Sequence, residues 1–257
     1  GNGKSMGEES FARRPSLTRE RKAANLEGSK ETRVVQYADL DQDMKYLGEG
    51  EFATAWQTRI DGKLVAIKML KKAKLEQADA LSGLKREIML MTLMVHDSIL
   101  RGLALGQLEG KPFMVIELLA SVLSKELPRP AETVPFWVRW RETRRWPLSR
   151  SLRLACELGS ALRYCHHEAF PHFRVLHRDI KPANIGFVQD GTAVLFDFGL
   201  ASLWTLDTGQ PTDAPRPLTG ETGSLRYMAP EVALTRPYNH KADVYSFSTV
   251  VWETMAW

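Results

Sequence analysis

The hydrophobic pattern predicts strands in the first part of the chain. A short strand is expected at residues 44–46, and residues 65–67 are continuously apolar, which favours a buried strand. Asp61 and Gly62 precede that run and predict a hairpin turn. Residues 111–120 predict a second buried strand that continues into a connecting segment.

Helical periodicity predicts longer elements between and after these strands. In the segment 75–95, Ile88, Met91 and Met94 recur at i, i+3 and i+6, so we expect an apolar stripe that faces a core. Helical patterns also cover residues 148–166 and 243–253.

Composition agrees with one globular domain. The chain has 257 residues, of which 44% are hydrophobic and 26% charged, which is enough for a real core. No apolar run approaches the ~20 residues of a membrane span, and no signal-peptide pattern is visible. Cys156 and Cys165 lie about 13 Å apart along one predicted helix, too far for a disulfide. We expect both to be reduced core residues of a cytoplasmic protein, with a nuclear location left open.

The net charge of +4 is unevenly placed. Residues 1–33 are polar and lack apolar periodicity, which predicts a disordered basic tail. Within that tail, residues 13–16 (Arg-Arg-Pro-Ser) resemble a phosphorylation site for basic-directed kinases, and a solvated basic tail is the simpler interpretation.

A second basic segment, residues 125–147, interleaves tryptophan with arginine. Such a segment can bind nucleic acid or acidic lipid through phosphate contacts and stacking. It can also be a packing helix with buried tryptophans and snorkelling arginines, or a protein-docking surface. We favour packing or protein docking, because no other feature indicates a nucleic-acid fold. The residues concerned are Trp137, Trp140, Trp146, Arg139, Arg141, Arg144 and Arg145.

The most informative segment is residues 177–199, HRDIKPANIGFVQDGTAVLFDFG. Asp179, Lys181 and Asn184 lie on a predicted loop, and Asp197 follows across a predicted hairpin. Phosphoryl transfer needs a carboxylate that orients the attacking hydroxyl, and oxygen ligands for the magnesium that neutralises the polyphosphate. Asp179 suits the first task, and Asn184 and Asp197 suit the second.

These residues resemble the catalytic loop and the metal-binding Asp-Phe-Gly of the eukaryotic protein kinases. The resemblance implies an α+β, bilobal fold with a small β-rich N-lobe (34–117), a hinge (117–121) and a mostly helical C-lobe (122–257). Residues 125–147 are then an insertion beside the hinge. The pattern covers about residues 46–257, and we expect further C-lobe helices to follow them. The run 243–253, DVYSFSTVVWE, is most similar to the tyrosine-kinase-like group.

The resemblance also implies a site for ATP and Mg²⁺. A glycine-rich loop at 47–53 would let backbone N–H groups approach phosphate, although Ala53 and Ala55 replace a glycine and a valine of the family pattern. Lys68 would meet the phosphates and Glu87; alternatively, Glu87 pairs with neighbouring basic residues on a solvated face. The residues implied to contact ATP are Leu47, Gly48, Glu49, Gly50, Phe52, Ala55, Ala66, Lys68, Ile116 as gatekeeper, and Glu117 and Leu119 of the hinge.

The family pattern continues downstream with an activation segment. Lys181 and Ser224 are the choices of serine/threonine kinases, and Ser224 is expected to bond Asp179 and Lys181. Thr219 and Thr222 are candidate phosphorylation sites that would pair with Arg178. Asp243 is expected to brace the backbone at His177 and Arg178.

Together these features predict a kinase that transfers the γ-phosphoryl group of ATP to serine or threonine of proteins. Asp179, Lys181, Lys68 and Glu87 are the predicted catalytic residues. One alternative is a pseudokinase or nucleotide-binding interaction module without turnover. Another is a nucleic-acid or lipid adaptor that works through residues 125–147.

Overall fold

The computed structural model describes residues 34–50, 53–74, 78–108, 111–128, 133–206, 213–220 and 222–256. Contacts group residues 32–257 as one compact unit. The predicted tail 1–33, with residues 13–16, and Phe52 of the glycine-rich loop lie outside the described residues.

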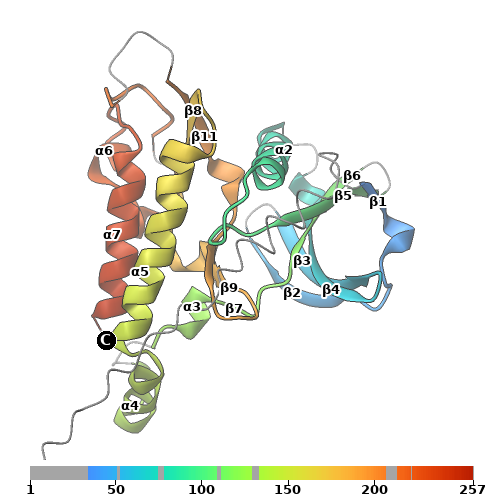
Figure 1. The fold of residues 1–257 in the computed structure, drawn as a ribbon, viewed down its shortest axis with the longest axis horizontal. Helices are drawn as coiled ribbons and strands as arrows, with labels where there is room; N and C mark the ends of the chain where they lie inside the picture. Colours follow the sequence, from blue (N-terminus) through green and yellow to red (C-terminus); the bar gives the residue numbers. More distant parts are fainter. Residues whose placement is uncertain are drawn as a thin grey trace, which may run out of the picture. The chain divides into compact units, whose positions relative to one another are not determined.

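A six-stranded sheet in the order β1-β5-β6-β4-β3-β2 forms the first lobe (Figure 1). Neighbouring strands are antiparallel, except for the parallel pair β1 and β5. Asp61 and Gly62 make the turn between β3 and β4 with φ values of 50° and 76°, as the sequence predicts. The strands are β1 (Val34–Gln36), β2 (Lys45–Glu49), β3 (Ala53–Ile60), β4 (Lys63–Leu70), β5 (Gly102–Leu108) and β6 (Lys111–Glu117).

Side chains alternate across β4 and so divide its residues between two faces. Val65 and Ile67 are buried in a cluster with Phe113 and Val115 on one face. Ala66 points to the other face and joins the main core. Because Lys68 lies two residues after Ala66, this alternation aims its side chain toward α2 (Ala78–Leu93).

The second lobe is mainly helical, with two small sheets, and its helices α5 and α7 lie side by side (Figure 1). Its helices are α3 (Leu123–Glu126), α4 (Phe136–Arg145), α5 (Leu148–Arg163) with a π-helical turn (Tyr164–Glu168), α6 (Pro230–Ala233) and α7 (Lys241–Met255). One sheet contains β7 (Ser121–Val122), β9 (Ile185–Phe187) and β10 (Ala193–Leu195), and the other pairs β8 (Phe173–Leu176) with β11 (Ser202–Thr205). Short 3-10 turns occur at Tyr37–Asp39, Lys72–Lys74, Pro182–Asn184, Phe198–Leu200 and Leu225–Tyr227.

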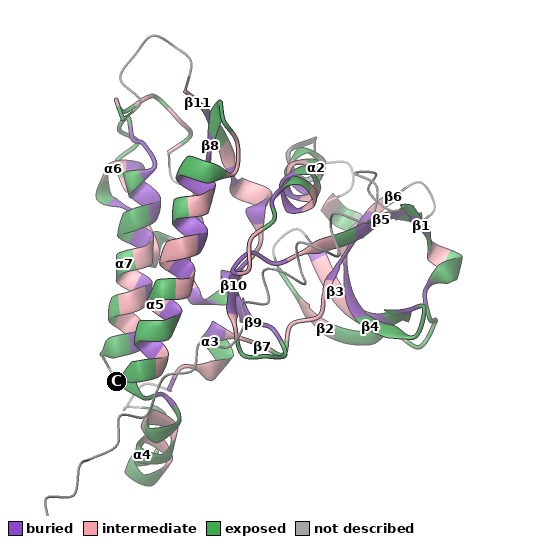
Figure 2. Cartoon of the chain, in the orientation of Figure 1, coloured by how far each residue is buried: buried purple, intermediate pink, exposed green. Residues whose placement is uncertain are grey.

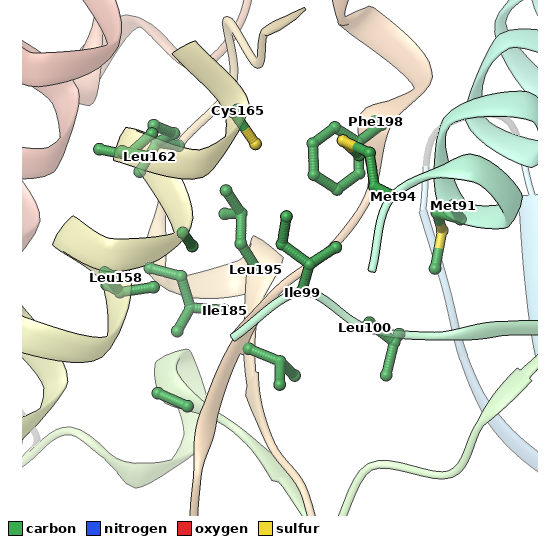
Figure 3. Packing of buried hydrophobic residues seen from close by; sticks show 14 of the residues in the cluster. Met91, Met94, Ile99, Leu100, Leu158, Leu162, Cys165, Ile185, Leu195 and Phe198 are labelled. Carbon is green, nitrogen blue, oxygen red and sulfur yellow. The ribbon is translucent and has the colours of Figure 1, made fainter. Parts of the chain in front are cut away.

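The main core is continuous from α2 to α5 (Figure 3). Met91 and Met94 are 2% and 3% exposed and Ile88 packs beside them, which confirms the predicted apolar stripe of α2. This shared core joins the two lobes through apolar contacts. Figure 3 shows Met91, Met94, Ile99 and Leu100 together with Leu158, Leu162, Cys165, Ile185, Leu195 and Phe198.

The two cysteines are free, as predicted, but only Cys165 is a core residue. The expectation of a buried Cys156 is wrong. Leu154 and Leu158 form the buried face of α5, and a residue two positions from each lies on the opposite side of a helix. Cys156 is therefore exposed.

The packing interpretation of residues 125–147 is correct for one tryptophan and wrong for two. Trp146, just after α4, is 4% exposed and donates its indole N–H to Oγ of Ser151 at 2.8 Å. Trp137 and Trp140 are 71% and 54% exposed. They lie on the exposed side of α4, opposite the half-buried side that contains Val138.

Helix α7 also shows an uneven distribution of apolar side chains. Val250 is fully buried, whereas Val244 and Trp252 are exposed.

Within the described part of the chain, no helix combines the length and apolar character that crossing a membrane requires.

Candidate active site

An ion-paired triad joins the two lobes at the end of β4. The Lys68 ammonium lies 2.7 Å from Oε2 of Glu87 on α2 and 2.7 Å from Oδ1 of Asp197, which follows β10. Glu87 is 3% exposed, so it does not pair on a solvated face. The contact between Lys68 and Glu87 that the sequence favours is therefore present.

Burial and charge act against each other in this triad. Burial alone would lower the pKa of Lys68, but attraction to Glu87 and Asp197 raises it above its usual value. Burial raises the pKa of Glu87 to about 7, although attraction to Lys68 opposes that change. Burial would also raise the pKa of Asp197, but attraction to Lys68 holds it below the usual range. The lysine is thus firmly cationic, and Glu87 is the member of the triad closest to protonation.

The Asp179 carboxylate accepts hydrogen bonds from three side chains. The hydroxyl of Ser224 donates to Oδ1 at 2.9 Å. Nδ2 of Asn184 and the ammonium of Lys181 lie 2.9 Å and 2.8 Å from Oδ2. Lys181 also donates to Oγ of Ser224 at 2.8 Å, which closes the network. The expected contacts of Ser224 are therefore confirmed, and the Asp179 side chain has one fixed orientation.

Asp243 at the start of α7 fixes the backbone that carries Asp179. Its two carboxylate oxygens accept the backbone N–H groups of His177 and Arg178, both at 2.8 Å. Arg178 has a φ of 68°, a strained value for a residue with a Cβ, so these two hydrogen bonds stabilise a costly turn. The predicted brace is confirmed.

Two histidines complete this support, and the sequence analysis missed both contacts. Nε2 of His166 lies 2.9 Å from Oδ2 of Asp243. Nδ1 of His177 accepts the backbone N–H of Asp179 at 3.3 Å, which assigns the proton to Nε2, 3.0 Å from the carbonyl oxygen of Phe196. The sequence gives no local signal for the contact between His166 and Asp243, because 77 positions separate the two residues.

The predicted metal ligands present suitable oxygens. Nδ2 of Asn184 donates both to Oδ2 and to the carbonyl oxygen of Asp179, so the amide oxygen is directed away from Asp179. Asp197 has left-handed backbone angles, φ 68° and ψ 66°, and its side chain stays 40% exposed. An amide oxygen and an accessible carboxylate are a donor set that fits Mg²⁺.

The predicted nucleotide residues lie on adjacent strands and the segment after them. Ala66 on β4 is the register partner of Ile116 on β6, and Ala55 on β3 is the partner of Lys68. The N–H of Glu117 donates to the carbonyl oxygen of Arg101 at 3.1 Å.

The glycine-rich loop begins at an irregularity of β2. The β2–β3 register shifts between Tyr46 and Gly48, where Gly48 has a φ of 155°. Glu49 forms an ion pair with Lys71 at 3.1 Å, and the N–H of Gly50 donates to the carbonyl oxygen of Ala53. Leu47 packs against the main core, and Leu119 of the hinge lies against Gly186 on β9.

Besides Ser224, the activation segment contacts the catalytic loop through Thr219 and Gly223. The Arg178 guanidinium donates to Oγ1 of Thr219 at 2.7 Å, and Thr222 donates to the carbonyl oxygen of Thr219 at 3.0 Å. Gly223 has a φ of 104°, and a Cβ there would lie 2.3 Å from the carbonyl oxygen of Arg178. Glycine is therefore required for the segment to approach the loop, a constraint that the sequence analysis also missed.

Comparisons with known proteins agree with this geometry. Residues 42–256 match the family described as the protein kinase domain. The chain is 29% identical to the dual specificity protein kinase shkE of Dictyostelium discoideum over 84% of this chain and 27% of that kinase. It is 33% identical to the wall-associated receptor kinase-like 1 of Arabidopsis thaliana over 81% of this chain and 26% of the relative.

A third relative is the serine/threonine-protein kinase VIK of Arabidopsis thaliana, 28% identical over 86% of this chain and 47% of that protein. The chain thus spans less than half the length of each of these relatives. These relatives include kinases of the tyrosine-kinase-like type, in agreement with the resemblance of residues 243–253 to that group. The family match covers most of the chain, from the strand before the glycine-rich loop to the end of α7, and the chain belongs to the protein kinase domain family.

Proposed function

We propose that this protein is an ATP-dependent serine/threonine kinase. The observation that carries the proposal is the Asp179 carboxylate, which Lys181, Asn184 and Ser224 hold in one orientation beside the activation segment. A carboxylate fixed in this way suits a group that orients an attacking hydroxyl and accepts its proton. The relatives named as serine/threonine or dual specificity kinases support the choice of acceptor.

The residues divide the chemistry between them. Asp179 orients the acceptor hydroxyl, and its Oδ1 already accepts a hydrogen bond from a serine hydroxyl, that of Ser224. Lys68, positioned by Glu87, and Lys181 stabilise negative charge on phosphate. Asn184 and Asp197 would hold Mg²⁺, which neutralises charge on the polyphosphate when bound.

The nucleotide would lie between the glycine-rich loop and the hinge. Leu47, Ala55, Ala66 and Ile116 offer apolar surface for adenine, and backbone groups of Glu117 and Leu119 offer hydrogen bonds. Gly48, Glu49, Gly50 and Phe52 would cover the phosphates. Ala53, where the family pattern has a glycine, should stiffen the glycine-rich loop slightly, and Ala55, in place of a valine, would cover the adenine less well.

The alternative, a nucleotide-binding module without turnover, is expected to lack one of the groups that the reaction needs. Lys68, Asp179, Asn184 and Asp197 are all present, which favours the kinase. The free thiols of Cys156 and Cys165 support a reducing, intracellular compartment as the place where it acts.

Transfer of radiolabelled γ-phosphate to a generic basic protein tests the proposal. Kinases turn over at ~1–100 per second, so even a strongly impaired enzyme gives a signal. We expect labelled phosphoserine or phosphothreonine with the wild-type chain and none with Asp179→Asn. Equal labelling by both proteins would disprove the assignment of Asp179, and ATP binding without any transfer would favour the non-catalytic alternative.

A further inference from the structure

Helix α4 presents a solvent-facing surface made only of aromatic and arginine side chains. Of its ten residues, the six exposed ones lie within one half of the helical circumference, and the half-buried residues occupy the other half. Figure 2 shows α4 as a largely exposed helix at the N-terminal end of α5. We call this surface the aromatic-arginine face; it consists of Phe136, Trp137, Trp140, Arg141, Arg144 and Arg145.

The side chains of this face form two parallel rows. One row contains Phe136, Trp140 and Arg144, each four residues after the last, and the other contains Trp137, Arg141 and Arg145. Both rows begin with aromatic rings and end with arginine. The face is therefore apolar at the N-terminal end of the helix and cationic at its C-terminal end, and each row extends about 12 Å along the helix axis.

The charge of the face is not balanced within α4. The helix has one acidic residue, Glu142, and it lies on the half-buried side. Three arginines thus point outward without an acidic side chain among them. Negative charge on an occupant would therefore complement this face.

The exposed side chains of Trp140 and Arg144 stack on each other. The guanidinium carbon of Arg144 lies 4.4 Å from the centre of the Trp140 ring. A stacked arginine keeps its remaining N–H groups available for carboxylates, and ordering before binding reduces the entropy lost on association. Tryptophan and arginine are also the residue types that contribute most at protein interfaces.

We propose that the aromatic-arginine face is a docking site for a protein segment that carries large apolar side chains next to a cluster of acidic residues. The apolar side chains would cover Phe136, Trp137 and Trp140, and the carboxylates would pair with the arginines. A helix that lies flat on a membrane separates its apolar and charged sides around the helix axis. Here the two kinds of side chain are separated along the axis, which fits a linear segment better than a lipid surface.

The test uses the whole chain and a short fluorescein-labelled peptide in which two leucines are separated from three glutamates by about one helical turn. Binding is measured by fluorescence anisotropy. We expect Arg144→Glu/Arg145→Glu and Trp137→Ala/Trp140→Ala each to weaken binding about tenfold or more. A peptide with glutamine in place of glutamate should lose affinity for the wild-type chain to a similar degree.

Matched variants separate this site from general charge effects and from catalysis. Lys45→Glu/Lys63→Glu makes the same change of net charge at exposed positions of β2 and β4 and should bind the peptide as the wild type does. Asp179→Asn should also bind normally, so docking can fail or succeed independently of phosphoryl transfer. Thermal melts of the α4 variants should match that of the wild type, because the substituted side chains are exposed.

Three results would overturn the proposal. One is an absence of peptide binding by the wild-type chain, and another is equal loss of affinity in the Lys45→Glu/Lys63→Glu control. The third is that phosphatidylserine vesicles or a single-stranded oligonucleotide bind more tightly than the peptide, and that only the α4 variants lose this binding. That result would assign the face to lipid or nucleic acid.

Discussion

Two regions of this protein kinase domain use charged side chains in opposite ways. Around the Asp179 carboxylate, every bond that fixes the side chain comes from within the protein, and Asp243 holds the backbone beneath it. On the aromatic-arginine face of α4, three arginines point outward beside exposed rings. Partners within the protein hold the Asp179 carboxylate in one geometry, whereas the arginines on the exposed side of α4, which have no acidic neighbour on that side of the helix, are available to another molecule.

The same contrast appears between two tryptophan–arginine pairs with identical spacing. Arg144 lies over Trp140 at 4.4 Å, and Arg150 lies over Trp146 at 4.0 Å. Trp146 is buried and Arg150 also contacts Glu126, while Trp140 is 54% exposed. The same tryptophan–arginine pair, four residues apart, can therefore stabilise the fold where other residues cover it, or remain available for binding where it is exposed.

The largest expected effect comes from substitutions in the catalytic region, which should impair phosphoryl transfer and leave the aromatic-arginine face unchanged. Asp179→Asn removes the carboxylate that we propose orients the acceptor hydroxyl, and it should reduce kcat by roughly 10²–10⁴-fold. ATP affinity should stay nearly unchanged, because Asp179 acts on the hydroxyl. Lys68→Met should lower both transfer and nucleotide affinity. Calorimetric titration with ATP beside the transfer assay distinguishes the two, and full activity of Asp179→Asn would contradict the assigned role.

A second prediction compares the two tryptophans. Trp146→Ala should destabilise the fold by about 3–5 kcal/mol, because it leaves a cavity and removes the hydrogen bond to Ser151. Trp140→Ala should change stability by about 0.5 kcal/mol or less. Urea melts of both variants give the answer. Equal losses would mean that the exposed pair is also structural.

A third prediction concerns the contact of Arg178 with Thr219. A phosphate on Thr219 would replace a neutral hydrogen bond with charge-assisted ones and stabilise the activation segment. Thr219→Ala/Thr222→Ala should therefore lower kcat/KM about tenfold. Active protein that is unmodified at both threonines by mass spectrometry, together with full activity of the double variant, would remove this hypothesis.

The smallest effect follows from the pKa of Glu87, about 7 in the folded protein against a usual 4.5. Protonation below about pH 7 would weaken its pairing with Lys68, so kcat/KM should fall a few-fold as the pH drops from 7.5 to 6. Glu87→Gln should have a lower kcat/KM that falls less steeply as the pH drops from 7.5 to 6. If kcat/KM of this variant falls as steeply as that of the wild type, the pH dependence belongs to another group.

The same pKa shift affects stability with the opposite sign. The folded protein holds the Glu87 proton more tightly than the unfolded chain, so this residue's contribution to stability decreases as the pH rises from about 4.5 to about 7. Glu87→Gln should remove that dependence from urea midpoints measured across the window. Activity and stability are thus expected to respond to Glu87 in opposite directions.

The sequence by itself indicated the proposed reacting groups and determined much of the local structure. The spacing of Asp179, Asn184 and Asp197 indicated phosphoryl transfer, because the chemistry requires those groups in a fixed arrangement. The Asp61–Gly62 turn and the stripe on α2 were also predictable, because turn geometry and helical periodicity act over a few residues.

Only the tertiary structure decided which distant groups support the site. His166 reaches Asp243 across 77 positions, and Gly223 must approach the carbonyl of Arg178 closely. It also decided that Trp146 is buried and that Trp140 and Cys156 are not. Periodicity defines the faces of a helix, but burial depends on which face another element covers, and that is fixed only when the whole chain packs.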